Sequence, residues 1–208
     1  MIDTIIDVKH DNALDIEKVK EAGIVAVIHK ATEGATFKDP KYLSRKQQAM
    51  DAGLLWGAYH FSSGVNPVAQ AENFLSVEDG TDSRILLSLD WEKSTSGEDM
   101  TLAQARVFIS TIKEKTGRYP LIYGGQMIRH NVTHQDQLLA NCPLWYVRYK
   151  DAPEGIPTNT WPTYTLWQYT DGKKGPEPRL TQGSSGADRN RYQGSTNDLR
   201  AAWPFTRA

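Results

Sequence analysis

Ile85-Leu86-Leu87-Ser88-Leu89-Asp90-Trp91-Glu92 is an apolar run that ends in two carboxylates spaced two residues apart. It is typical of a buried β-strand. Because side chains alternate along a strand, Asp90 and Glu92 share one face with Ser88, whereas the intervening leucines and Trp91 share the other. Two strand residues rise ~6.6 Å, so both carboxylates can reach one substrate bond. Such a pair suits glycoside hydrolysis, in which one acid protonates the leaving oxygen.

On either side of this run, short apolar runs alternate with amphipathic segments. The predicted strands are 4–9, 24–32, 54–61, 85–91, 121–124, 144–149, 163–170 and 187–192. Helices are predicted after each of the first four strands. Their expected first residues are Asn12, Asp39-Pro40, Asn66-Pro67 and Thr101 with Gln104, and glycines 23, 53 and 117 end three of them. Only weaker helices are expected later, near 135–140 and 198–202.

Repeated strand–helix units imply a parallel sheet, because a crossover helix connects parallel neighbours. About eight strands favour a closed barrel over an open sheet, so the predicted fold is α/β, a single TIM-like barrel. No internal repeat, second core or linker is evident, and residues 1–208 are expected to form one domain. Neither a G-x-G-x-x-G motif after the first strand nor a P-loop occurs, which argues against dinucleotide and nucleotide binding.

Composition narrows the functional classes further. A formal net charge of −1 over 208 residues gives no electrostatic reason to bind nucleic acid or an anionic membrane. No apolar run approaches the ~20 residues of a membrane span. The N-terminus lacks the basic and apolar regions of a signal peptide, so synthesis in the cytoplasm is expected. Cys142 is the only cysteine, which excludes an intrachain disulfide and is compatible with a reducing compartment.

The predicted strand ends carry polar side chains. In a parallel α/β barrel the active site lies at the C-terminal ends of the strands. Four acids gathered at one mouth cost stability, and such clustering raises a glutamate pKa from ~4.3 toward neutrality. This pattern therefore predicts a functional site. In chain order, the residues at these ends are Asp7, Lys30, Glu33, His60, Asp90, Glu92, Tyr123, Tyr149, Gln168 and Asp188.

Other chemistries find less support in the sequence. Five histidines are present, but there is no His-x-His on the first strand and no H-E-x-x-H helix, so no metal is expected. His60 is expected to act as a hydrogen-bonding partner. Cys142 precedes Pro143 at the start of a strand, a poor place for a nucleophile, and no G-x-S-x-G elbow occurs for a serine triad.

The same strand ends resemble the lysozymes of glycoside hydrolase family 25, the Chalaropsis-type muramidases. The matching motifs occur in the same order as in the family and cover about residues 3–195. The resemblance implies a modified barrel of eight strands and about five helices, no cofactor, and hydrolysis of the β-1,4 bond between N-acetylmuramic acid and N-acetylglucosamine in peptidoglycan. The matching words are Ile6-Asp7-Val8, Lys30-Ala31-Thr32-Glu33-Gly34, Gly57-Ala58-Tyr59-His60-Phe61, Leu89-Asp90-Trp91-Glu92, Pro143-Leu144-Trp145, Trp167-Gln168-Tyr169-Thr170 and Asp188-Arg189-Asn190.

The resemblance also assigns roles. Glu92 is implied as the proton donor, acting first as general acid and then as general base, and Asp90 as its partner. Asp7 and Asp188 would complete the acidic cluster. The family is regarded as retaining, and Asp90 would either attack the anomeric carbon or orient the substrate's 2-acetamido group as an internal nucleophile. The expected substrate contacts are Lys30, Glu33, His60, Tyr123, Tyr149 and Gln168.

Two segments depart from the family pattern. Lys9 and His10 follow Val8, where a small polar residue is usual two positions after the aspartate. A lysine at this position could tune Asp7, contact acidic groups of the substrate, or point outward. The loop 172–186 matches no family motif and is expected to be a solvated basic loop, with Lys173, Lys174 and Arg179.

Two alternative functions are weighed against the muramidase. A chitinase-like glycosidase would be expected to carry a D-x-x-D-x-D-x-E strand, which is absent. A non-catalytic wall-binding module would not need the acid cluster. The expected partner is therefore the peptidoglycan glycan strand, without nucleic acid or membrane insertion. Because that substrate lies outside the cytoplasmic membrane, release as a phage endolysin or delivery by a specialised secretion machine is expected, and no separate wall-binding domain is seen.

Overall fold

Eight strands form a closed barrel, because the first strand pairs with both the second and the last strand around the ring. The computed structural model describes residues 1–206. The prediction of an eight-stranded barrel is confirmed. In order around the ring, its strands are β1 (Ile2–Val8), β3 (Ala26–Glu33), β5 (Leu55–Phe61), β6 (Leu86–Asp90), β7 (Leu121–Gly124), β8 (Leu144–Val147), β9 (Leu166–Thr170) and β11 (Asp188–Tyr192).

The last strand corrects the expectation of a purely parallel sheet. Neighbouring strands from β1 to β9 run parallel, but β11 runs antiparallel to both β9 and β1. Residues 171–187 connect β9 to β11 and hold only the short strand β10, and the chain returns in the opposite direction. As a result, Asp188 begins β11 and still lies beside the C-terminal ends of the other strands.

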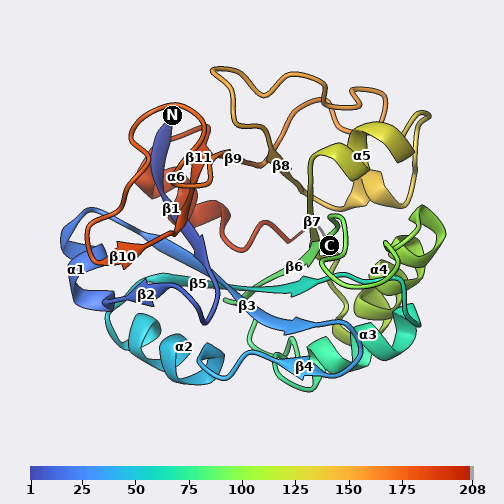
Figure 1. Ribbon diagram of the computed structural model, residues 1–208, viewed down its shortest axis with the longest axis horizontal. Coiled ribbons are helices and arrows are strands. Elements are labelled where there is room, and N and C mark those ends of the chain that lie inside the picture. The colour runs from blue at the N-terminus through green and yellow to red at the C-terminus, as the bar shows by residue number, and fades with distance from the viewer. Residues whose placement is uncertain (207–208) are drawn as a thin grey trace.

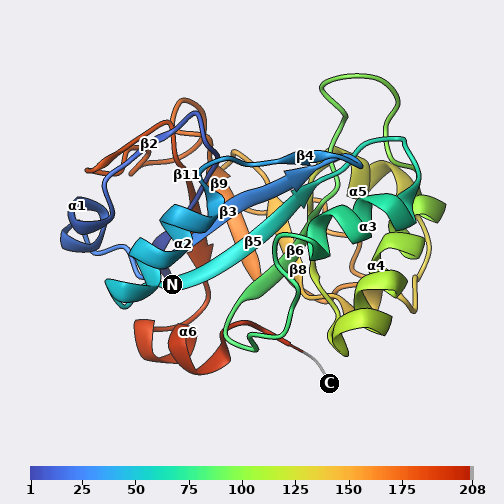
Figure 2. The same cartoon turned by 90° about the horizontal axis from the view of Figure 1, so that it is seen from below.

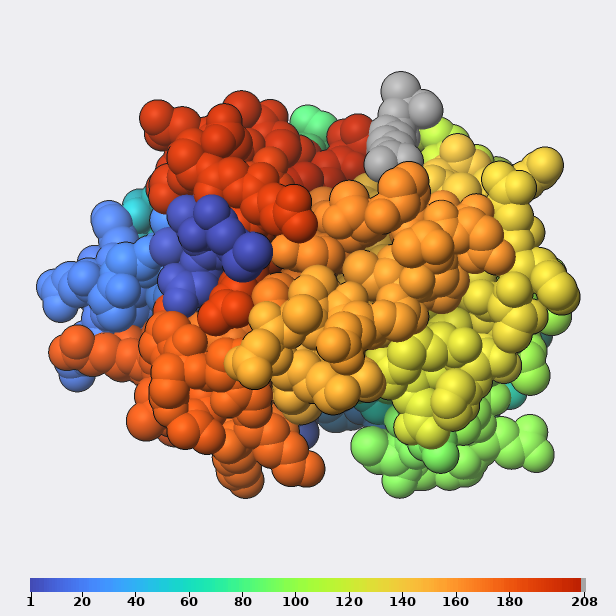
Figure 3. All heavy atoms as spheres, turned by 90° about the horizontal axis from the view of Figure 1, so that it is seen from above, coloured from blue at the N-terminus to red at the C-terminus, as the bar shows by residue number. Residues whose placement is uncertain are grey.

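Two short strand pairings lie outside the eight-stranded ring. β4 (Phe37–Lys38) runs antiparallel to the end of β3. β2 (Ala13–Leu14) pairs with β10 (Ser184–Ser185), which ties the loop after β1 to the loop before β11. Segments from the two ends of the sequence therefore lie side by side. Figure 3 shows the N-terminal residues in dark blue, with red C-terminal segments above them and orange segments below.

Residues 1–206 form six α-helices and one short 3₁₀ helix, one α-helix more than the resemblance implied. The first four follow one another around the outside of the barrel (Figure 1). None is long and apolar enough to cross a membrane. The helices are α1 (Ile16–Glu21), α2 (Tyr42–Asp51), α3 (Pro67–Leu75), α4 (Leu102–Thr116), α5 (Gln126–Asn131), η1 (Leu139–Asn141) and α6 (Thr196–Ala202).

Two predicted helix starts are wrong. α1 is capped by Asp15 rather than by Asn12, whose side-chain amide bonds the carbonyls of residues 185 and 186 instead. α2 begins after Lys41, because the Asp39 carboxylate accepts the Lys41 backbone N–H in a turn before the helix. The helix expected near 135–140 is reduced to η1, and α5 lies earlier. The caps at Asn66 and Thr101 are confirmed.

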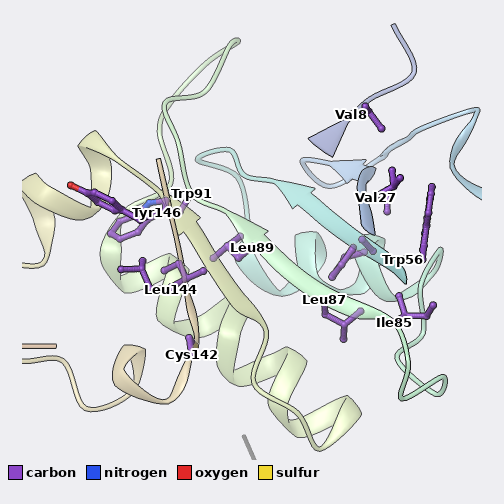
Figure 4. Packing of buried hydrophobic residues seen from close by; sticks show 14 of the residues in the cluster. Val8, Val27, Trp56, Ile85, Leu87, Leu89, Trp91, Cys142, Leu144 and Tyr146 are labelled. Carbon is purple, nitrogen blue, oxygen red and sulfur yellow. The ribbon is translucent and has the colours of Figure 1, made fainter. Parts of the chain in front are cut away.

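The core forms two layers because strand side chains alternate between the faces of the sheet. The outer layer lies between strands and helices and includes Leu87, Leu89 and Trp91 (Figure 4). Trp91 therefore serves packing, as predicted, and its indole N–H donates to the Met100 carbonyl at 2.8 Å. The inner layer fills the barrel with Ile5, Ile28, Leu86, Leu121, Trp145 and Leu166.

One end of the barrel is closed by α6. Leu199 and Trp203 join the inner layer, and the Trp203 indole N–H donates to the Arg84 carbonyl, just before β6 begins. Figure 2 shows α6 on the side of the barrel away from β4 and the C-terminal strand ends. Only the opposite mouth, where the predicted site residues lie, is therefore free to admit a substrate.

Candidate active site

A cavity of about 270 Å³ opens at the C-terminal ends of the strands. It brings together eight of the ten residues predicted from the strand ends, because seven lie at or just after the C-terminal ends of parallel strands and Asp188 begins the antiparallel β11 at the same mouth. These eight are Asp7, Lys30, Glu33, Asp90, Glu92, Tyr123, Gln168 and Asp188.

Asp90 ends β6 and is buried in the cavity wall. Its Oδ1 atom is inaccessible to solvent and has no hydrogen-bond partner among the described residues. Burial and the nearby Glu92 carboxylate raise the pKa of Asp90, and the Lys30 ammonium opposes that rise. An unsatisfied buried acceptor is costly, which adds to the reasons that the Asp90 anion is unfavourable here.

Glu92 follows β6 by two residues and is half-buried in the same cavity. Burial, followed by the Asp7 carboxylate, raises the pKa of Glu92 to about 7, while the Tyr123 hydroxyl and Lys30 oppose the rise. A carboxyl group with this pKa can both give and take a proton near neutral pH, which is the property that a general acid/base requires.

Asp7 is the last inward-facing residue of β1. Its carboxylate accepts the Gln168 amide at 3.0 Å through both oxygens and the Asn190 amide at 2.8 Å. Burial raises the pKa of Asp7 to about 6, although these two amides stabilise the anion. Asp7 therefore carries negative charge over most of the range in which Glu92 titrates.

Gln168 connects the acids on this side of the mouth. Its Nε2 donates to Asp7 and, at 3.1 Å, to Asp188, whereas its Oε1 accepts the hydroxyls of Tyr123 at 2.8 Å and Tyr149 at 2.9 Å. Burial and the Asp7 charge raise the pKa of Asp188 to about 9. The amide thus fixes the positions of two carboxyl groups that would otherwise repel each other.

Lys30 and Glu33 form an ion pair in the wall formed by β3. Lys30 Nζ lies 2.7 Å from Glu33 Oε2 and 4.5 Å from the centroid of the Phe61 ring. The Lys30 ammonium places a buried positive charge near Asp90 and Glu92. It opposes the rise in the pKa values of both carboxyl groups, although burial outweighs it.

The structure does not place His60 in the cavity, which corrects the expectation that it contacts the substrate. Because it lies between the inward-facing Tyr59 and Phe61, strand alternation turns its ring outward toward α3 and α4. There it bonds Thr32 Oγ1 at 2.8 Å and Gln70 Oε1 at 3.1 Å. It is a hydrogen-bonding partner, as expected, but one within the outer core.

Tyr149 also lies outside the residues that line the cavity. It follows β8 and reaches the site only through its hydroxyl bond to Gln168. Its position supports the amide rather than a wall of the cavity.

Several lining or supporting residues were not predicted as site residues. Tyr59, Phe61 and Trp145 line the cavity, and the Trp145 indole N–H donates to Asn190 Oδ1 at 2.6 Å. Asn190 in turn holds Asp7. Strand parity could have identified them: Tyr59 and Phe61 face inward on the strand where His60 faces outward, and Asn190 lies two residues after Asp188 on the same face. The sequence interpretation considered only the polar residues at the strand ends.

No metal site accompanies these acids. Within residues 1–206, no group of three or more His, Cys, Asp or Glu side chains is arranged to hold a metal ion. The cavity instead offers carboxyl groups that exchange protons near neutral pH, next to a buried cation and aromatic walls. Such an arrangement can protonate a leaving oxygen and stabilise a developing positive charge.

A family model described as Glycosyl hydrolases family 25 matches residues 6–177. Among curated proteins, the chain is 32% identical to lysozyme M1 of Streptomyces globisporus, covering 94% of this chain and 69% of that protein. It is also 32% identical to the N,O-diacetylmuramidase of Chalaropsis sp., covering 72% and 79% of the two chains.

The fold has a similar counterpart among solved structures. A bacterial lysozyme from Streptomyces coelicolor superposes with a TM-score of 0.77 at 30% identity, covering 94% of each chain. The likeness thus extends over nearly the whole length of both chains.

Proposed function

This chain belongs to the glycosyl hydrolases of family 25, and from that membership and the acidic cavity we propose that it cleaves peptidoglycan by acid/base catalysis at Glu92. The enzyme is a lysozyme of the muramidase type, which hydrolyses the β-1,4 bond between N-acetylmuramic acid and N-acetylglucosamine. It acts at the cell wall, where this polymer lies. The observation that carries the catalytic assignment is the pairing of Glu92, whose pKa is about 7, with the buried Asp90 in one cavity.

Glu92 protonates the glycosidic oxygen as the bond breaks. The pKa of about 7 keeps its proton available at neutral pH, whereas an ordinary glutamate would be ionised. After the leaving group departs, the Glu92 anion takes a proton from water, which attacks the anomeric carbon. Two displacements at that carbon retain its configuration.

Asp90 supports the first displacement from the other side of the reacting carbon. We favour the pathway in which the substrate's 2-acetamido oxygen attacks and Asp90 accepts the acetamido N–H, because burial and the Glu92 carboxylate destabilise the Asp90 anion and a hydrogen bond from the substrate would stabilise it. Because that hydrogen bond favours the Asp90 anion, the proton held by the two neighbouring carboxyl groups would reside on Glu92. Direct attack by Asp90 would instead produce a covalent adduct, detectable by mass spectrometry of the intact protein.

Asp7 and Asp188 act on the electrostatics of the site. The Asp7 anion disfavours the Glu92 anion and so helps to keep the proton on Glu92. Asp188, whose pKa is about 9, stays mainly protonated at neutral pH and can donate a hydrogen bond to a sugar. The proposed substrate contacts are therefore Lys30, Glu33, Tyr123 and Gln168, together with the aromatic walls.

The test is a digestion of purified peptidoglycan with mass spectrometry of the fragments. The wild type is expected to release fragments with muramic acid at the reducing end, initially as the β-anomer by NMR. Glu92→Gln keeps the side-chain size but holds no transferable acid proton, so turnover is expected to fall by roughly 10²- to 10⁴-fold. Glu114→Gln, on the exposed surface of α4, is the matched control and should not change turnover.

Retained activity in Glu92→Gln would contradict the role given to Glu92. Cleavage of chitin oligomers with intact peptidoglycan would favour the chitinase-like alternative. Tight sugar binding without turnover at any pH would favour a wall-binding module.

A further inference from the structure

The proposed substrate carries negative charge beside the scissile bond, and this inference rests on that proposed function. N-acetylmuramic acid bears a lactyl ether whose carboxyl group is either free or joined by an amide bond to a peptide that has carboxylates of its own. Two cations line the cavity that would receive it, Lys9 and Lys30.

Lys30 is already committed within the protein. Its side chain is only 8% exposed, its Nζ lies 2.7 Å from Glu33 Oε2, and the Phe61 ring covers it. A substrate carboxylate would have to displace Glu33 from a largely buried pair, which is unfavourable.

Lys9, by contrast, is available to a ligand. Its side chain is 47% exposed, and its ion pair is with Asp11, a carboxylate that is 61% exposed and 3.1 Å away. Pairs this exposed are weak and are screened by salt, so a substrate carboxylate can take the place of Asp11 at little cost.

The backbone that carries Lys9 is fixed even though its side chain is free. Arg45, a largely buried residue of α2, donates to the Lys9 carbonyl at 3.0 Å and to the Asn12 carbonyl at 2.6 Å. Asn12 accepts the Lys9 N–H at 2.7 Å and donates to the carbonyls of Ser185 and Gly186. The base of the lysine is thus held at the cavity rim between β1 and the segment leading to Asp188.

The acidic residues around this rim do not prevent an anion from binding by electrostatic repulsion. Burial keeps Asp188 and Glu92 protonated to higher pH than ordinary carboxyl groups, so the mouth carries less negative charge than its composition suggests. Lys9 also lies close enough to Asp188 to lower its pKa, which places the ammonium beside the site.

We propose that Lys9 binds a carboxylate on the substituent of the muramic acid residue and thereby selects muramic acid-containing chains over uncharged N-acetylated glycans. Arg45 and Asn12 are positioning residues for this contact. The lysine occupies the position two after Asp7, where the sequence departs from the usual small polar residue.

The experiment compares Lys9→Met, Lys9→Arg and the control Lys18→Met on three substrates. Lys18 forms a similarly exposed ion pair with Asp15 and does not line the cavity. The substrates are peptide-free chains with a free lactyl carboxylate, the same chains with that group amidated, and chains carrying peptides, whose lactyl group is already an amide.

On a substrate with the recognised carboxylate, Lys9→Met is expected to raise KM about two- to fivefold at low salt, with kcat nearly unchanged, and the difference should shrink as salt is added. Lys9→Arg and Lys18→Met should resemble the wild type. An effect on peptide-free chains identifies the lactyl carboxylate as the ligand, whereas an effect confined to peptide-bearing chains identifies the peptide.

An equal change on the amidated, peptide-free chains would overturn the proposal, because that substrate offers no carboxylate. Calorimetric binding of the same chains to Glu92→Gln, with and without Lys9→Met, gives a readout independent of turnover. If the wild type releases no fragments, the proposed function fails, and binding still decides the role of Lys9.

Discussion

Glu92 is held in its protonated form mainly by burial and by the Asp7 charge, so its behaviour should follow Asp7. As the general acid must be protonated, kcat is expected to fall as pH rises through about 7. Asp7→Asn removes a nearby anion, which lowers the pKa of Glu92 and moves this limb of the kcat profile to lower pH. The check is kcat from pH 4 to 9.

The exposed Asp51→Asn serves as the control for that profile. An alkaline limb that stays in place in Asp7→Asn, or moves to higher pH, would contradict the electrostatic link between Asp7 and Glu92.

Asp188 should lower the stability of the fold at neutral and alkaline pH. Its pKa is raised from 3.8 to about 9, so the folded state holds the proton more tightly than the unfolded chain. The resulting stabilisation is complete below about pH 4 and is lost as pH rises toward 9. Asp188→Asn, which cannot ionise, is expected to raise the free energy of unfolding by about 1–3 kcal/mol at pH 8.

Urea unfolding at pH 4 and at pH 8 measures this effect. The gain should be much smaller at pH 4, where the folded-state carboxyl group is protonated and the unfolded-state group, with a pKa of 3.8, is about half protonated. A gain of equal size at both values would point to packing rather than to charge.

The placement of a single residue at the cavity could be predicted where its position at a strand end was enough to decide it. The acids at the cavity were found because strand ends converge in a barrel. His60 was predicted to lie in the cavity because it is polar, but its position along the strand turns its side chain outward. Trp145 was missed because it is apolar, although its side chain faces inward. The alternation of inward and outward side chains along each strand, combined with residue type, would have distinguished these two residues. That alternation can be applied only once the bounds of the strand are known.

At the scale of elements, α4 begins with a capping box that should stabilise the fold directly. Thr101 Oγ1 accepts the Gln104 N–H at 3.2 Å, and Gln104 Oε1 accepts the Thr101 N–H at 2.9 Å. Thr101→Ala is expected to lower the free energy of unfolding by about 1 kcal/mol, measured by urea titration.

Thr111→Ala provides the matched control, because Thr111 lies half-buried within the same helix and its hydroxyl donates to the Val107 carbonyl. Since alanine favours helix interiors, this variant should be neutral or slightly more stable. Equal destabilisation by both variants would argue against the cap.

The same comparison explains which helix starts were predictable. Asn66 and Thr101 cap their helices with local hydrogen bonds, which spacing alone predicts. Asn12 has the right residue type, but its amide is used by residues 185 and 186, more than 170 positions away. No local pattern could reveal that partner.

For the whole molecule, α6 seals the barrel at the end opposite the cavity. Leu199 is fully buried in the inner core. Leu199→Ala is expected to lower the free energy of unfolding by about 2–5 kcal/mol, while kcat of the folded enzyme stays near that of the wild type. Chemical unfolding and peptidoglycan turnover on the same preparations test both parts.

Leu180→Ala removes the same atoms from an exposed position and should be nearly neutral. A loss of kcat in Leu199→Ala equal to that in Glu92→Gln would show that the closed end and the mouth are coupled.

The barrel itself was predictable from the count of strands and the early helices. The direction of β11 was not predictable, because the two connections without a helix lead to opposite results: β8 and β9 are parallel, whereas β9 and β11 are antiparallel. Asp188 nevertheless reached the site, since an antiparallel strand that begins at the mouth serves as well as a parallel one that ends there.

The closing of the ring by β1 and β11 also bears on the timing of biosynthesis. Asp7 leaves the ribosome 183 residues before Asn190, whose amide holds its carboxylate, and well before the neighbouring Asp188. A nascent chain therefore carries Asp90 and Glu92 without the partners that complete their surroundings. Cleavage that depends on Asp7 and Asp188 would therefore begin only after β11 has been made and has paired with β1.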